Sequence, residues 1–151
     1  YIIEDNKYDE ANNSSLVLRI EGKSKSFLFT GDVEEEAEEN IAHLGKWLKS
    51  DVIKVPHHGG KTSASEWFFS TVSPEVAVIS AGRDNSYGHP HQETLDMLAN
   101  AKVYRTDMDG AVKITETDGR LEIKTYKDFQ FSKAKGFKDE VRNFKRLFEV
   151  W

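Results

Sequence analysis

Short apolar runs separated by polar turns recur along this chain, and their spacing predicts strands alternating with helices. Alternating or continuous apolar residues predict strands at residues 15–20, 26–30, 52–55, 75–79, 102–105, 111–116 and 121–126. Apolar residues at spacings of three and four predict helices at residues 33–49, 65–72 and 92–100. A hairpin, then alternating helices and strands, then a second hairpin predict an α/β architecture with a mixed sheet.

The C-terminal segment has a different pattern. Its apolar residues fall on one face of a helix predicted at residues 137–151, and Lys, Arg and Glu occupy the other face. The apolar positions are Val141, Phe144, Phe148 and Trp151, with Leu147 beside them. Such an amphipathic helix requires an apolar partner surface. We therefore divide the chain into residues 1–127 and a helical extension at residues 128–151.

Composition and length restrict the class of protein. A chain of 151 residues fits one domain, and its 38% hydrophobic and 31% charged residues indicate a soluble domain with a modest core. No apolar run approaches the length of a transmembrane helix, and no signal peptide is visible at the start. The compartment is not settled by these features, although we favour the cytoplasm over secretion. Because the first residue is Tyr1, we expect the chain to be a piece of a longer protein.

The absence of cysteine excludes disulfides, thiolate metal sites and cysteine nucleophiles. Any metal must then be bound by His, Asp or Glu, which indicates zinc, manganese or a similar ion. The net charge of −5 argues against broad binding to duplex DNA, which depends on clustered Lys and Arg. It does not argue against phosphodiester hydrolysis, because bound metal ions supply positive charge locally.

Two adjacent histidines, His57 and His58, follow the strand predicted at residues 52–55 and precede Gly59 and Gly60. Imidazole is the commonest metal ligand in proteins and a general acid or base near neutral pH. At the exit from a strand, both rings can reach one pocket. The pair alone is more often explained by packing or by an exposed loop, so its meaning depends on the rest of the chain.

Polar groups follow four of the predicted strands, at the point where each strand ends. They are Asp32, the pair His57 and His58, the segment Ser80-Ala-Gly82 leading to residues 85–91, and Thr106-Asp107. If the strands run in the same direction in one sheet, their carboxyl ends form one rim, where α/β folds usually build sites. An Asp and two histidines there could bind one metal ion, or part of a pair of ions.

Each of these residues also has a simpler structural interpretation. Asp32 could cap the helix that begins at Val33. His89 and His91 could be inert in a polar loop, and Lys54 and Lys61 could be ordinary solvated charges. The acidic run at residues 34–39 fits a solvated helix face. The aromatic residues expected in the core are Trp47, Trp67, Phe68 and Phe69.

Taken together, the polar segments resemble a known family. The segments are Asn12-Asn-Ser-Ser-Leu-Val-Leu18, Phe27-Leu-Phe-Thr-Gly-Asp32, Lys54-Val-Pro-His-His-Gly59, Ser80-Ala-Gly-Arg-Asp-Asn-Ser-Tyr-Gly-His-Pro-His91 and Tyr104-Arg-Thr-Asp-Met-Asp-Gly110. In order and spacing they are similar to the C-terminal half of the metallo-β-lactamase-fold hydrolases of the ComEC-like competence group. The similarity covers roughly three quarters of the chain, from residue 12 to about residue 125.

The resemblance implies an αββα sandwich with one or two zinc or manganese ions at a rim of the sheets. It implies that Asp32 is a bridging carboxylate and that His57 and His58 divide metal binding and contact with the scissile group. We assign His58 as the ligand, and His57 as the substrate partner with a further share in the metal site. His89 is the second catalytic candidate. The substrate side is completed by Asn85, Tyr87 and Lys61.

The chain departs from the family pattern in two respects. Gly60 and Lys61 follow the His-His-Gly segment, where the family usually has Ser. The N-terminal motif of the family, of the His-x-His-x-Asp-His type, is absent from this chain, and the remaining His43 is interpreted as structural. The chain therefore resembles half of the fold and supplies half of the metal shell. We expect the sheet to expose apolar surface covered by a missing segment, a second copy or the C-terminal helix.

Two functions follow from these expectations. The first is a metal-dependent hydrolase that uses a metal-activated water to cleave phosphodiesters in nucleic acid or in small phosphoesters. We expect the part of the protein given by this chain to be inactive by itself. Its partner would be a missing N-terminal half or another chain. The second is a non-catalytic half-domain that acts as a protein-interaction or structural module, including as a homo-oligomer.

Overall fold

The computed structural model describes residues 11–63 and 65–126. The helix expected at residues 137–151 lies outside the described residues. The strands are β1 (Leu18–Glu21), β2 (Ser26–Phe29), β3 (Val52–Lys54), β4 (Val76–Ile79), β5 (Lys102–Arg105), β6 (Val112–Thr117) and β7 (Arg120–Thr125). The α-helices are α1 (Glu35–Ile41), α2 (Glu66–Val72), α3 (Gln92–Met97) and α4 (Thr106–Asp109), and the 3-10 helices are η1 (Ala11–Ser14), η2 (Ala42–Leu48) and η3 (Pro56–Gly59).

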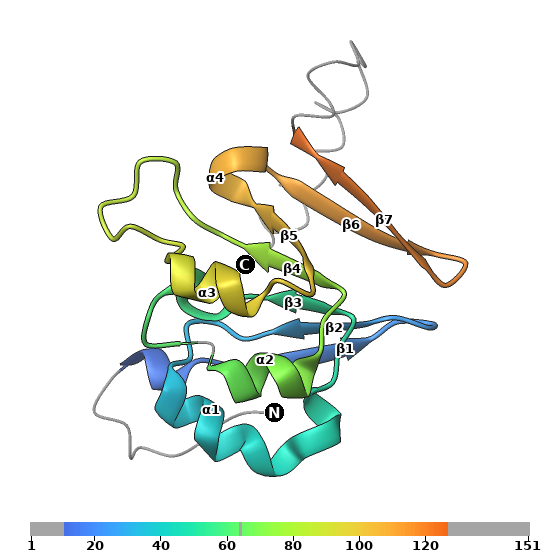
Figure 1. The fold of residues 1–151 in the computed structure, drawn as a ribbon. Helices are drawn as coiled ribbons and strands as arrows, with labels where there is room; N and C mark the ends of the chain where they lie inside the picture. Colours follow the sequence, from blue (N-terminus) through green and yellow to red (C-terminus); the bar gives the residue numbers. More distant parts are fainter. Residues whose placement is uncertain (1–10, 64, 127–151) are drawn as a thin grey trace, which may run out of the picture.

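The described residues form one five-stranded sheet and one separate hairpin (Figure 1). In the larger sheet the strands lie in chain order, β1-β2-β3-β4-β5. Strand β1 is antiparallel to β2, whereas β2 to β5 are mutually parallel. Strands β6 and β7 form the antiparallel hairpin. The predicted mixed sheet of an α/β protein is therefore confirmed.

The chain order of the parallel strands explains where the helices lie. A connection between neighbouring parallel strands is almost always right-handed, so successive connections that step in one direction place their helices on the same face. Accordingly, α1, α2 and α3 lie on one side of the sheet (Figure 1). The core forms between them and the sheet. Its members include Leu28, Ile53 and Ala77 from the strands, Ala37 and Ile41 from α1, Phe68, Phe69 and Val72 from α2, and Leu98 after α3.

The opposite face of strands β1 and β2 carries apolar side chains that remain exposed. Leu18 pairs with Phe29, and side chains directly opposite each other project from the same face of a sheet. Leu18, Ile20 and Phe29 are 41%, 44% and 43% exposed, and neighbouring Leu16 is 54% exposed. The apolar surface that was expected for half of a fold is thus present on this face.

Several predicted elements differ in the structure. The helix predicted at residues 33–49 is divided into α1 and η2, and Gly45 within η2 has non-helical dihedral angles. The resulting change of direction turns Trp47 outward, so that it is 65% exposed and the prediction of a core position is wrong. The first strand begins at Leu18 and not at Ser15, where it was predicted.

The short helix α4 was not predicted. It follows β5 directly and is held by acidic side chains at its own ends. The Asp109 carboxylate accepts the backbone N–H of Arg105 at 2.9 Å, and the guanidinium of Arg105 donates to both oxygens of Asp107. Among the described residues, none of the helices has both the length and the apolar character needed to span a membrane.

Candidate active site

The carboxyl ends of β2, β3, β4 and β5 meet at one edge of the sheet, because these four strands are parallel. Asp32 follows β2, and His57 and His58 follow β3. Ser80 follows β4, and Thr106 follows β5. The expected rim of polar groups is therefore present, and we call it the histidine rim.

The backbone of the histidine pair is in an unusual conformation. His57 and His58 both have positive φ angles, of 42° and 56°. Residues with a side chain rarely adopt this left-handed region, and the strain is found most often at functional sites. The turn is fixed by two hydrogen bonds, from His57 N–H to the Gly31 carbonyl at 3.3 Å and from Gly60 N–H to the His57 carbonyl at 2.8 Å.

Asp32 and His58 face each other across this edge. The Asp32 Oδ1 and His58 Nε2 atoms are 3.6 Å apart. The other ring nitrogen of His58, Nδ1, lies 2.6 Å from the Ser80 carbonyl oxygen. A carbonyl only accepts, so Nδ1 must carry a proton, and in the neutral ring the lone pair belongs to Nε2, the nitrogen nearer to Asp32.

This pair of atoms fits two positions of a metal shell. Nitrogen and oxygen ligands at about 2.0–2.1 Å from a tetrahedral zinc ion lie about 3.3–3.4 Å from each other, close to the observed separation. A carbonyl that fixes the far nitrogen of a histidine is also the usual partner of a metal ligand. Within residues 11–63 and 65–126, however, no group of three or more His, Asp or Glu side chains is arranged to hold an ion.

The interpretation of Asp32 as a helix cap is wrong. Helix α1 begins one turn later, and its N-cap residue, Glu34, makes no side-chain capping bond. The Asp32 carboxylate instead lies 3.3 Å from the ammonium of Lys54. The Lys54 side chain is 21% exposed and is not the ordinary solvated charge that was expected.

His57 is paired with a carboxylate that the sequence analysis missed. Its Nδ1 lies 3.0 Å from Glu34 Oε1, and both side chains are largely buried. The two atoms lie within the distance of an ion pair, but their geometry is not that of a hydrogen bond. The buried Nδ1 therefore has no hydrogen-bond partner among the described residues. Two asparagines hold Glu34 in place. The Asn12 side-chain amide donates to the Glu34 carboxylate at 3.0 Å, and the Asn13 side-chain oxygen accepts the backbone N–H of Glu34 at 2.9 Å.

His89 stands at the centre of a cluster of rings. Its ring centroid lies 5.6 Å from those of His57 and Tyr87, 6.3 Å from that of His58 and 5.2 Å from that of His91. Burial lowers the pKa of the His89 imidazole, and the neighbouring histidines lower it further. The ring is therefore held mainly neutral near pH 7. His89 and His91 are half-buried members of this cluster.

The loop that carries His89 approaches the rim at a glycine. Gly59 has a φ of 79°, and a Cβ built on it would lie 2.7 Å from Pro90 Cβ. A side chain at this position would push the loop away from His57. The Gly59 carbonyl also accepts the N–H of His91 at 3.0 Å and the hydroxyl of Thr94 at 3.2 Å.

The three residues assigned to the substrate side differ in their surroundings. Asn85 is used by the loop itself, since its amide donates to the Gly82 and His89 carbonyls and accepts the N–H of His89. Tyr87 is 76% exposed, and its ring stacks on that of His89. Lys61 is 61% exposed and pairs with Glu93 at 3.4 Å.

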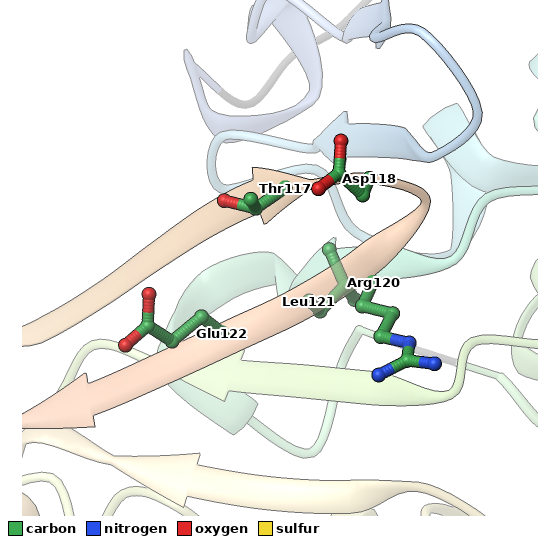
Figure 2. A pocket seen from close by; sticks show the side chains of 5 residues that line it. All are labelled: Thr117, Asp118, Arg120, Leu121 and Glu122. Atoms are coloured by element: carbon green, nitrogen blue, oxygen red, sulfur yellow. The ribbon is translucent and has the colours of Figure 1, made fainter.

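Two recesses in the described surface lie away from the histidine rim. One is on the β6–β7 hairpin and is lined by Thr117, Asp118, Arg120, Leu121 and Glu122 (Figure 2). The other is lined by residues near the amino ends of strands β2, β3 and β4, including Ser26, Asp51 and Glu75. Neither contains a residue that was assigned to the site.

Comparison with known proteins identifies several relatives, among them competence proteins. The chain is 44% identical over 104 residues to ComE operon protein 3 of Bacillus subtilis, covering 68% of this chain and 13% of that protein. It is 41% identical over 115 residues to Recombination protein 2 of Haemophilus influenzae, covering 74% and 14%. It is 33% identical over 132 residues to Competence protein ComA of Neisseria gonorrhoeae, covering 84% and 19%.

The chain spans less than a fifth of the length of these curated relatives. No protein-family model matches it. The regions of similarity nevertheless cover two thirds or more of this chain in all three comparisons. Its homologues include competence proteins, which supports its assignment to the ComEC-like competence group.

Proposed function

We propose that this chain forms part of the active site of a metal-dependent hydrolase with the metallo-β-lactamase fold, which cleaves phosphodiester bonds. The facing pair of Asp32 and His58, 3.6 Å apart, is the observation that carries this proposal. Both atoms are of the type that binds zinc or manganese, and the Ser80 carbonyl fixes the ring nitrogen that faces Asp32. The other ligands would come from a longer protein or from a partner chain.

The neighbouring histidines would act on protons. A divalent ion held by Asp32 and His58 would stabilise negative charge on a phosphoryl group and lower the pKa of a water molecule. His89 is kept neutral by burial, so its imidazole can accept a proton from that water or from a substrate group. His57, whose Nδ1 lies 3.0 Å from Glu34 Oε1, is the candidate for donating a proton to a leaving oxygen.

Hydrolysis of bis(p-nitrophenyl) phosphate by a longer protein that contains this chain tests the proposal. With Mn²⁺ or Zn²⁺ present, Asp32→Asn and His58→Ala should each lower kcat/KM by more than about 100-fold, because even the loss of a group that only hydrogen-bonds to a metal ligand costs about 10–100-fold. His43→Ala, in the exposed part of η2, is the matched control. Undiminished activity of the His58 variant would refute the assignment.

A comparison of DNA with the small phosphodiester as substrates distinguishes the substrate class. A nuclease should release nucleotides from single-stranded or duplex DNA at a rate that depends on Asp32, whereas an enzyme for small phosphoesters should act only on the small substrate. The net charge of −5 supplies little general attraction for a nucleic acid strand. Cleavage of DNA would therefore require binding energy from the site or from the rest of a longer protein.

The exposed apolar face of β1 and β2 favours a second function, as a non-catalytic interaction module. Leu18, Ile20 and Phe29 form a surface suited to another protein layer. Metal content distinguishes the two functions. Stoichiometric zinc or manganese in the purified protein contradicts the module, whereas an empty site together with dimerisation that requires Phe144 and Trp151 supports it.

A further inference from the structure

Lys54 is the only described side chain that lies in ion-pair distance of Asp32 besides His58. Its Nζ atom is 3.3 Å from Asp32 Oδ1 and 2.6 Å from the Gly31 carbonyl oxygen. The oxygen that faces Lys54 is the same Oδ1 that faces His58 Nε2. The carboxylate atom best placed to bind an ion is therefore already next to a positive charge.

The backbone holds Lys54 in this position. Lys54 is the last residue of β3 and pairs with Phe29, the last residue of β2. Its carbonyl accepts the hydroxyl of Thr30 at 2.7 Å, which ties it to the segment that leads to Asp32. The short distance to the Gly31 carbonyl fixes the ammonium at the turn. The contact thus has several independent restraints.

We propose that Lys54 is the resident counter-ion of Asp32, and that a divalent cation must displace its ammonium from Oδ1 in order to bind. This inference rests on the proposed metal site and adds a built-in competitor to it. An ammonium and a divalent ion cannot share one carboxylate oxygen at close range without strong repulsion. Lys54 therefore neutralises the charge of Asp32 while no metal ion is bound, and it weakens adventitious metal binding at Asp32 and His58.

The charge and the length of Lys54 can be separated by substitution. Lys54→Met keeps an unbranched chain without the charge, and Lys54→Gln is a second neutral variant in case the first does not fold. Lys54→Arg keeps the charge and is the matched control. Removing one positive charge next to a ligand oxygen should raise affinity for a divalent cation about tenfold or more, whereas the Arg variant should not gain affinity.

Binding of Mn²⁺ to the whole chain, followed by electron paramagnetic resonance of the free ion, measures this effect without an activity assay. A dissociation constant about tenfold lower for Lys54→Met or Lys54→Gln than for the wild type and Lys54→Arg supports the inference. An equal or weaker affinity, or no binding by the folded neutral variants, overturns it.

A double variant separates this inference from the proposed function. In Asp32→Asn with Lys54→Met, the gain should disappear because the oxygen for which the two cations compete has lost its charge. If the gain persists, the ion binds elsewhere and the assignment of Asp32 as a ligand fails. If Asp32→Asn alone abolishes binding while Lys54→Met gives no gain, only the role of Lys54 fails.

Discussion

The Nδ1 atom of His58 lies 2.6 Å from the Ser80 carbonyl oxygen, and this contact determines which ring nitrogen faces Asp32. Ser80 follows β4 and His58 follows β3, so the parallel pairing of these strands sets the contact. The sheet thereby orients a potential ligand through its own backbone, with no additional side chain.

The tautomer of His58 is the first testable consequence. Because a carbonyl accepts from Nδ1, the neutral ring should carry its proton on Nδ1, in contrast to the Nε2–H form that is commoner in exposed histidines. Two-dimensional ¹H–¹⁵N correlation of the imidazole nitrogens at about pH 8, where an ordinary histidine is neutral, distinguishes the forms. An Nε2–H ring would show that the contact with Ser80 does not orient the lone pair.

Gly31 should be sensitive to substitution for a steric reason that does not apply to Gly45, another glycine with positive φ. Gly31 and Gly45 have φ angles of 58° and 47°, but a Cβ on Gly31 would lie 2.7 Å from Ser15 Cβ, whereas a Cβ on Gly45 meets nothing within 4 Å. Gly45→Ala should cost about 1–3 kcal/mol from backbone strain alone. Gly31→Ala should cost about 1–3 kcal/mol more because it also overpacks. Urea unfolding measures both, and equal losses would contradict the steric argument.

Glu38 should contribute to stability far more than its neighbour Glu39. Glu38 is fully buried, and its carboxylate accepts the backbone N–H and the hydroxyl of Ser65 at 3.0 and 2.8 Å. Glu38→Ala leaves these donors unsatisfied and should cost about 2–4 kcal/mol. Glu39 is exposed, so Glu39→Ala should change the free energy of unfolding by no more than about 0.5 kcal/mol. Similar losses in both variants would refute the role given to Glu38.

Asp107 should make the stability depend on acidic pH. The two-point contact with the Arg105 guanidinium lowers the pKa of the Asp107 carboxyl below its ordinary 3.8. A carboxyl whose pKa is lowered by folding adds stability that is complete above its unfolded pKa and is lost as the pH falls through the folded pKa. Unfolding free energies between about pH 6 and pH 2 should therefore fall less steeply in Asp107→Asn. An unchanged slope would show that the pair contributes nothing to acid sensitivity.

Much of the rim could be predicted from the sequence, because it depends on short-range signals. The apolar runs before Asp32 and His57 indicate strands, and the polar residues after them mark strand ends. Parallel pairing then brings those ends together, as the structure confirms for β2 to β5. The strand limits were less accurate, since the first strand begins at Leu18 and not at Ser15.

The errors concern side chains whose surroundings depend on distant segments. Glu34 and Glu38 belong to an acidic run that reads as a solvated face, but Asn12, Asn13 and Ser65 reach them from other segments. Lys54 could not be distinguished from a surface lysine, because its partner Asp32 is on a neighbouring strand end. Trp47 was placed in the core because the break at Gly45 was not anticipated. Long-range contacts of this kind leave no periodic signal.

The metal content of a longer protein that contains this chain tests the assignment of Asp32 and His58 most directly. After purification and dialysis against buffer without chelator, elemental analysis of the wild type should find at least about one zinc or manganese ion per chain, since catalytic sites keep their ion through several ligands. Asp32→Asn and His58→Ala should lose most of that metal, and His43→Ala should retain it. Equal metal in the wild type and in both site variants, or no metal in the wild type, would contradict a metal site at the histidine rim.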